Sequence, residues 1–124
     1  MKAGEEAERR REARLVEAII TNSPKGRGGV IDLEDTLRAI HEGRVQTLVY
    51  QDGYRAPGYR CKGCGYVTAL ATPQCPYCGS EFSNIIDAVE LAVRHVMQAG
   101  GDVEVLHDPQ AYSNLNQIGA LLRY

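Results

Sequence analysis

The chain has 124 residues, of which 44% are hydrophobic and 24% are charged, with a formal net charge of −2 at pH 7. This length suits one domain with at most a small appendage, and the composition excludes disordered and fibrous classes. No apolar run approaches a membrane span, no signal peptide opens the chain, and the slight negative charge gives no general reason to bind nucleic acid. We therefore expect a cytoplasmic protein whose thiols stay reduced.

Residues 3–20 predict a helix whose two halves differ in character. The first half is almost entirely charged, whereas apolar residues such as Val16 and Ile19 appear only in the second. We expect the second half to pack on a core and the first half, with its run Arg9–Arg11 among glutamates, to be a solvated face. Residues 1–20 are interpreted as a charged helix that links the domain at 21–124 to a preceding one.

Short elements follow this helix. Residues 21–29 contain a proline and several glycines, and are expected to form a connector. An extended piece is predicted at Val30–Ile31. The segment 45–50, VQTLVY, is rich in β-branched and aromatic residues and predicts a buried strand.

A helix is predicted between these two extended pieces. Its apolar residues recur at helical spacing, Asp32 or Asp35 can cap its start, and it is expected to run to Glu42. His41 falls at the edge of the apolar face. This position favours a surface or capping role for His41 over a catalytic one.

All four cysteines lie in one stretch, as two Cys-x-x-Cys pairs: Cys61 with Cys64, and Cys75 with Cys78. Two cysteines three positions apart on a tight turn can direct both sulfurs at one point, and two such turns complete a tetrahedron. A glycine follows each pair and allows backbone N–H groups to turn toward the sulfurs. The pattern predicts a four-thiolate zinc site.

Four protein ligands leave no coordination position for water or substrate, so the zinc is expected to be structural. A pair of disulfides and a dithiol redox centre are the alternatives, and the two matched pairs favour zinc over both. The cysteine segment has few large apolar side chains, so metal would supply much of its folding free energy. We expect loss of one cysteine to loosen this segment while the rest of the domain stays folded.

A long helix is predicted after the cysteines. Ser83 or Asn84 can cap its start, and it is expected to run to Ala99 with a broad apolar stripe. His95 falls off that stripe and is expected to be exposed. Two glycines directly after the helix mark its end.

Two more strands are predicted at Asp102–Leu106 and at 118–124, with a turn of helix at 111–116 between them. A strand–helix–strand connection of this length implies a parallel pair of strands with a right-handed crossover. The predicted fold class is therefore α/β. We expect a small α/β/α sandwich with a mixed sheet, interrupted by an inserted zinc minidomain at 55–82.

The segment 31–50, IDLEDTLRAIHEGRVQTLVY, resembles the C-terminal domain of class-1 translation release factors of archaea and eukaryotes. Their relative Pelota and release-factor-like proteins of bacteria share this domain. The resemblance continues through the cysteine segment, which is similar to the zinc-bearing minidomain of archaeal members. It resumes in GGDVEVL and the closing ALLRY, and covers the chain from about Leu15.

This resemblance implies a fold like that of kink-turn-binding ribosomal proteins, in a domain that contacts a translational GTPase or the ribosome. In the family, peptidyl-tRNA hydrolysis belongs to a separate domain with a Gly-Gly-Gln motif. This chain has neither that motif nor the Asn-Ile-Lys-Ser stop-codon motif. The expected function is a non-catalytic protein-interaction domain, with structural zinc, whose parent acts in translation termination or ribosome rescue.

An RNA- or ribosome-binding zinc ribbon is the alternative function. Arg55, Arg60 and Lys62 lie near the cysteines beside tyrosines such as Tyr59 and Tyr66, and so combine charge with stacking groups for rRNA or tRNA. The same positive charges would offset the negative charge of a four-thiolate zinc centre. No enzymatic activity is expected, since no histidine or carboxylate is paired locally with a candidate nucleophile. We also expect no membrane association and no small-molecule substrate.

Overall fold

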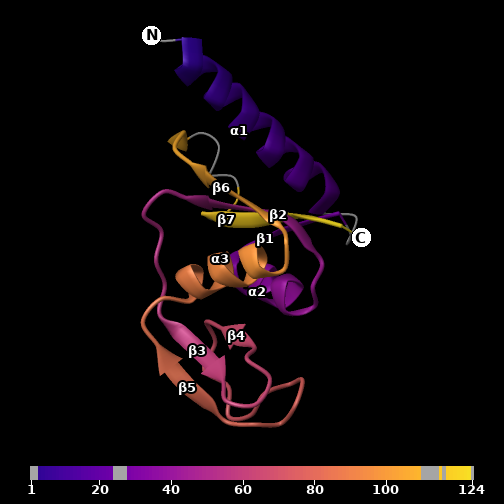
Figure 1. Ribbon diagram of the computed structural model, residues 1–124, viewed down its shortest axis with the longest axis vertical. Coiled ribbons are helices and arrows are strands. Elements are labelled where there is room, and N and C mark those ends of the chain that lie inside the picture. The colour runs from indigo at the N-terminus through magenta and orange to yellow at the C-terminus, as the bar shows by residue number, and fades with distance from the viewer. Residues whose placement is uncertain (1–2, 24–27, 110–114, 116, 124) are drawn as a thin grey trace.

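The computed structural model describes residues 3–23, 28–109, 115 and 117–123, except for the side chains of residues 3–6 and 8. A four-stranded sheet stands between two helical layers, and a second, three-stranded sheet lies at the end of the molecule away from the N-terminus (Figure 1). Within the described residues, no helix is long and apolar enough to cross a membrane.

The main sheet has the strand order β1 (Gly29–Ile31), β7 (Ile118–Leu122), β2 (Val45–Gln51) and β6 (Asp102–Leu106). β2 and β6 are parallel, whereas β7 pairs antiparallel with both β1 and β2. The mixed sheet expected from the sequence is confirmed. The last strand of the chain is therefore a central strand of the sheet.

Helices cover both faces of this sheet (Figure 1). α1 (Ala3–Asn22) lies across one face, on which its residues Val16 and Ile19 are buried. α2 (Leu33–His41) and α3 (Ala88–Gln98) cover the other face. The α/β/α sandwich is confirmed, and so is the packing of the second half of α1.

Two apolar cores fill the two layers, because side chains along a strand alternate between faces. In β2, for example, Leu48 and its neighbour Val49 are both fully buried but belong to different cores. The core beneath α1 also contains Leu115, the one described residue of the turn of helix expected at 111–116. The larger core beneath α2 and α3 is built from Leu37, Ala39, Val45, Leu48, Val67, Ala88, Ala92, Val96, Ile118, Ala120 and Leu122.

Glu12 of α1 is buried, with only 2% of its surface exposed, although it belongs to the charged half of that helix. Its Oε1 atom accepts hydrogen bonds from the backbone N–H groups of His107 (2.7 Å) and Asp108 (3.1 Å). Two charge-assisted hydrogen bonds offset the cost of burying a carboxylate. Glu12 therefore fastens α1 to the chain that leaves β6.

The second sheet has the order β4 (Val67–Thr68), β3 (Gly58–Cys61) and β5 (Phe82–Ile85). The prediction of a helix beginning after Ser83 or Asn84 is therefore wrong. Residues 82–85 pair antiparallel with β3, a partner that the local apolar spacing does not reveal.

Helix α3 begins instead at Ala88, behind the N-cap residue Asp87. The Asp87 carboxylate accepts hydrogen bonds from the N–H groups of Val89 (3.0 Å) and Ala56 (3.3 Å). The N–H of Ala88 in turn donates to the carbonyl oxygen of Ala56 (2.7 Å). One side chain thus caps the helix and joins the point where the chain enters the cysteine segment to the point where it leaves.

The three-stranded sheet is continuous with the larger core. Val67 of β4 is buried among the core residues beneath α2 and α3, and Ile85 of β5 packs against the same cluster. β3 passes so close to β4 that a Cβ atom at Gly58 would lie 2.6 Å from the carbonyl oxygen of Thr68. The cysteine segment therefore shares its apolar packing with the sandwich.

Candidate metal centre

The four cysteines converge from two turns at the outer end of the second sheet. Their Sγ atoms all lie within 4.8 Å of one another. The closest pairs each join one turn to the other: Cys61 to Cys78 at 3.3 Å, and Cys64 to Cys75 at 3.6 Å. All four are free thiols, so neither Cys-x-x-Cys pair forms a disulfide in this structure.

These distances fit a tetrahedral centre. With a zinc–sulfur bond of about 2.3 Å, a regular tetrahedron places its sulfurs about 3.8 Å apart. The described cysteines provide four soft donors and bring no carboxylate or imidazole into the same cluster. This donor set suits a thiophilic metal and fits zinc.

The two turns repeat one backbone pattern. Gly65 and Gly79 have φ angles of 83° and 79°, which favour glycine over any residue with a side chain. Their N–H groups donate to the carbonyl oxygens of Cys61 (3.2 Å) and Cys75 (2.9 Å) respectively. Each Cys-x-x-Cys-Gly unit is therefore a closed turn, as expected from the glycine after each pair.

Backbone N–H groups point at the sulfurs inside these turns. Cys61 Sγ accepts from Gly63 (3.3 Å) and Cys64 (3.4 Å), and Cys75 Sγ accepts from Tyr77 (3.4 Å). Such donors stabilise a thiolate relative to a thiol, and metal binding requires the thiolate.

The same preference appears at Cys78. Hydrogen bonds from the Ser80 side chain and backbone lower the pKa of the Cys78 thiol to about 6. An exposed residue such as Cys78 is also open to an incoming metal ion.

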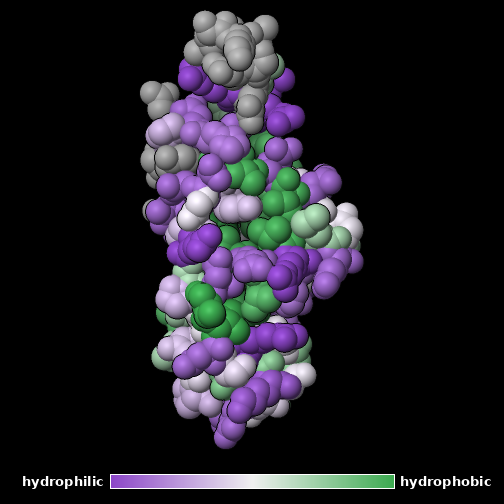
Figure 2. Space-filling model, turned by 60° about the vertical axis from the view of Figure 1, so that its left-hand side comes forward, coloured by the Kyte–Doolittle hydropathy of each residue, from purple (hydrophilic) through white to green (hydrophobic). Residues whose placement is uncertain are grey.

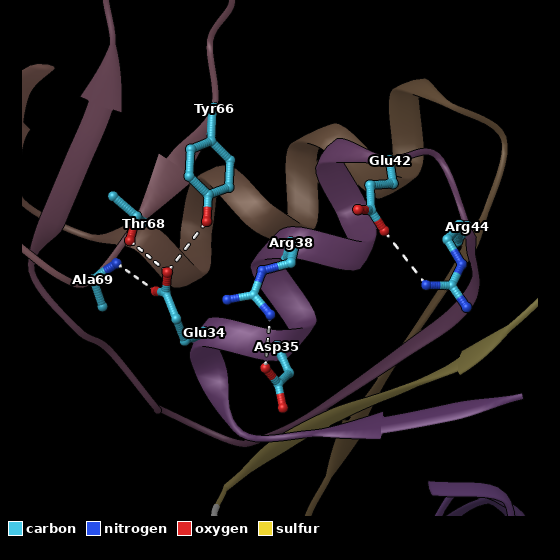
Figure 3. A network of polar contacts seen from close by, with 8 residues as sticks. All are labelled: Glu34, Asp35, Arg38, Glu42, Arg44, Tyr66, Thr68 and Ala69. Atoms are coloured by element: carbon cyan, nitrogen blue, oxygen red, sulfur yellow. Dashed lines mark hydrogen bonds and ion pairs between the residues drawn. The ribbon is translucent and has the colours of Figure 1, made fainter. Parts of the chain in front are cut away.

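Helix α2 of the sandwich holds the cysteine segment through Glu34 (Figure 3). Its carboxylate accepts hydrogen bonds from the hydroxyls of Tyr66 (3.2 Å) and Thr68 (2.6 Å) and from the N–H of Ala69 (2.9 Å). Burial and the Glu34 charge raise the pKa of Tyr66 to about 12, so its hydroxyl stays protonated as a donor. No sequence signal singled out Glu34, because its partners lie more than 30 positions away.

His41, at the end of α2, makes a second contact with the cysteine segment. Its Nε2 atom lies 3.9 Å from Cys64 Sγ. Its ring contacts those of Tyr66 and Tyr77, with centroid distances of 5.1 and 4.3 Å. A surface or capping role therefore does not describe His41 fully, because this residue lies between the sandwich and the thiols.

Two of the residues on which the RNA alternative depends, Tyr66 and Lys62, are engaged in contacts within the chain. Tyr66 is buried and hydrogen-bonded to Glu34, and Lys62 lies 3.9 Å from Glu81 in an exposed ion pair. Arg60 remains exposed on β3, next to the half-buried Tyr59. Tyr66 is thus used to fasten the segment to α2, whereas Arg60 and Tyr59 are not.

The two remaining histidines are not members of the four-thiol cluster. His95 was expected to be exposed but is half-buried in α3, and this burial lowers its pKa. His107 Nδ1 lies 3.6 Å from Asp52 Oδ2 at the exposed end of β6.

A mixed sheet between helices, with a four-cysteine segment inserted between β2 and α3, defines the class of this domain. The chain has the fold of the C-terminal domain of the release-factor and Pelota proteins. It matches the C-terminal domain of a peptide chain release factor from Methanosarcina mazei with a TM-score of 0.65 and 19% identity, over 97% of this chain and 85% of that one.

Two longer proteins contain the same fold. Archaeoglobus fulgidus Pelota matches with a TM-score of 0.62 and 16% identity, over 97% of this chain and 31% of its own. S. cerevisiae Dom34 matches with a TM-score of 0.53 and 13% identity, over 87% of this chain and 25% of its own. The chain thus corresponds to one part of each protein.

Sequence comparison gives a different relative. Reverse gyrase 1 of Sulfurisphaera tokodaii is 28% identical over 93 residues, which cover 75% of this chain and 8% of that protein. The chain therefore spans less than a tenth of this curated relative's length. No family model matches the chain.

Proposed function

We propose that the chain is a non-catalytic protein-interaction domain of a translation release-factor-like, ribosome-associated protein in the cytoplasm. The observation that carries this proposal is the fold likeness to a release-factor C-terminal domain over 97% of the chain. Dom34 is described as a translation termination-like factor that interacts with Hbs1. We infer that this chain also binds a protein partner, a translational GTPase or the ribosome, and that its parent acts in termination or rescue.

We also propose that Cys61, Cys64, Cys75 and Cys78 hold a structural zinc ion. The convergence of four thiols within 4.8 Å, with backbone N–H groups directed at the sulfurs, supports this assignment. Four thiolates complete a tetrahedral site, so bound zinc would stabilise the fold rather than activate water or substrate. The small core of the cysteine segment, Cys61, Tyr66 and Cys75 with Phe82, is consistent with a need for metal.

An apolar hollow supports the proposed protein partner. It has a volume of about 500 Å³ and lies between the chain that follows β2 and the start of α3. Ile86 on its rim is 94% exposed, and Tyr54, Val89 and Val93 line it. Figure 2 shows two groups of hydrophobic side chains on one face of the molecule, separated by a band of hydrophilic ones. Protein interfaces bury apolar groups of this kind at their centres.

The proposal is tested with the full chain, the ribosomes and the translational GTPases of the same organism. Co-sedimentation and direct titration should detect binding, and a peptidyl-tRNA hydrolysis assay on ribosomes should detect no product. Hydrolysis by this chain alone, or binding to neither ribosome nor GTPase, would overturn the proposal. Bound metal is measured by atomic emission, with a zinc content of about one per chain expected.

A matched pair of substitutions locates the contact. Ile86→Asp should abolish binding to the GTPase, whereas Met97→Asp, an exposed position on α3 outside the residues that line the hollow, should not. Neither change removes a buried side chain, so both variants should fold. An RNA-binding zinc ribbon would instead bind ribosomal RNA directly and lose affinity steeply as salt rises.

A further inference from the structure

The two cysteine turns share a backbone pattern, and they differ in the side chains that lie near the second sulfur of each turn. In each turn the first cysteine's N–H donates to the carbonyl oxygen of the residue five positions later: Cys61 to Tyr66 (2.8 Å) and Cys75 to Ser80 (2.9 Å). The N–H group of Ser80 lowers the pKa of Cys78, and the N–H group of Tyr66 lowers that of Cys64, although burial is the larger effect there and raises the pKa of the Cys64 thiol to about 12. The backbone thus acts in the same direction at the second cysteine of both turns.

The side chains at these equivalent positions behave differently. The Ser80 side chain, acting as a donor, lowers the pKa of the Cys78 thiol. The Tyr66 hydroxyl cannot do the same for Cys64, because it donates to Glu34 on α2. By the repeat alone, Cys64 would lack the side-chain donor that Cys78 has.

His41 occupies the place of the missing donor. Its Nε2 atom is 3.9 Å from Cys64 Sγ, and it comes from α2 rather than from the turn itself. The Tyr66 and Tyr77 rings contact each other, with centroids 4.9 Å apart, and both contact the imidazole. These contacts fix the orientation of the ring in front of the sulfur.

We propose that His41 is a positioning residue of the metal centre, whose Nε2–H donates a hydrogen bond to the Cys64 thiolate. The inference rests on the proposed zinc site and deepens it. Four thiolates around a divalent ion carry a net negative charge, and donors to the sulfurs stabilise that charge and orient the ligands. Because this donor belongs to α2, metal binding and docking of the cysteine segment on the sandwich strengthen each other, as linkage requires.

Two substitutions separate the hydrogen bond from the ring contacts. His41→Gln keeps an N–H donor at nearly the reach of Nε2 but loses the ring, whereas His41→Phe keeps a ring against the tyrosines but loses the donor. Affinity is measured on the full chain by Co²⁺ titration, followed through the thiolate-to-metal absorption bands, and by Zn²⁺ competition with a chelator. Ser80→Ala, which removes the equivalent donor at Cys78, is the reference for the size of the effect.

His41→Phe should weaken metal affinity by about tenfold or more, as loss of an outer-shell partner does, and His41→Gln should stay within about threefold of the unsubstituted chain. Hydrogen exchange of the metal-loaded His41→Phe protein should also show faster exchange at β4. Any other pattern overturns the inference, including one in which His41→Gln loses metal affinity and His41→Phe retains it. If the unsubstituted chain bound no Co²⁺ or Zn²⁺, the zinc proposal itself would fail and this inference with it.

Discussion

The Tyr66 hydroxyl lies 3.2 Å from the Glu34 carboxylate, and this contact joins the cysteine segment to helix α2 of the sandwich (Figure 3). Tyr66 also belongs to the small core that contains Cys61 and Cys75. One residue therefore contacts both the candidate metal centre and the sandwich. The orientation of the cysteine segment therefore depends on this contact.

Glu34→Ala should destabilise the domain by about 2–3 kcal/mol, because it leaves two hydroxyls and a backbone N–H without their common acceptor. Asp35→Ala is the matched control: it shares the first turn of α2, but its ion pair with Arg38 is exposed and contributes only a few tenths of a kcal/mol. Urea unfolding of both variants measures the difference. Equal losses would mean that the Glu34 contacts add nothing beyond the helix dipole.

Stability should fall as the pH rises from about 10 to about 12. Burial and the Glu34 charge raise the pKa of Tyr66 from 10.0 to about 12 in the folded protein. A group whose pKa is raised on folding contributes stability below its unfolded pKa and loses it as the pH passes its folded pKa. Denaturant unfolding at a series of pH values should show a shallower decline in Tyr66→Phe than in the unsubstituted chain. Parallel curves would contradict this assignment.

Sequence patterns predicted most of the sandwich because its elements carry local signals. The buried strand at Val45–Gln51 and the apolar spacing of α2 are contained in their own residues. The predicted start of α3 was wrong for a related reason. Ile85 and Ile86 continue the apolar spacing of the helix, whereas β5 pairs with residues of β3 that lie more than 20 positions earlier in the chain. Local periodicity cannot detect a non-local strand partner.

The candidate metal centre also has residues that a local sequence pattern predicts and residues that it does not. Its four cysteines are close in sequence, so spacing alone brought them together, and the structure places all four in one cluster. Glu34 and His41 reach this region from an earlier helix and belong to no motif. Their roles follow only from how α2 packs on the cysteine segment, and packing is not encoded in any local pattern.

Cys75→Ser should abolish binding of the proposed zinc ion and loosen residues 58–85, while the helices and main sheet stay folded at lower stability. The reason for the lower stability is Val67, which the cysteine segment contributes to the core beneath α2 and α3. Circular dichroism should retain the helical signal, and hydrogen exchange should increase in β3, β4 and β5. The exposed Ser83→Ala on β5 is the control. Loss of all helical signal would mean that the sandwich cannot fold without the metal-bound segment.

Glu12→Ala should detach α1 from the end of β6 and lower the free energy of unfolding by about 2–4 kcal/mol. The substitution removes the carboxylate that accepts from the N–H groups of His107 and Asp108, at a position only 2% exposed. The exposed Glu17→Ala on the same helix should cost a few tenths of a kcal/mol at most. Limited trypsin digestion at the exposed arginines of α1 would report detachment directly, with faster cleavage expected in Glu12→Ala. If both variants were cleaved and unfolded alike, α1 would be held by its other contacts, above all the apolar packing of Leu15, Val16 and Ile19.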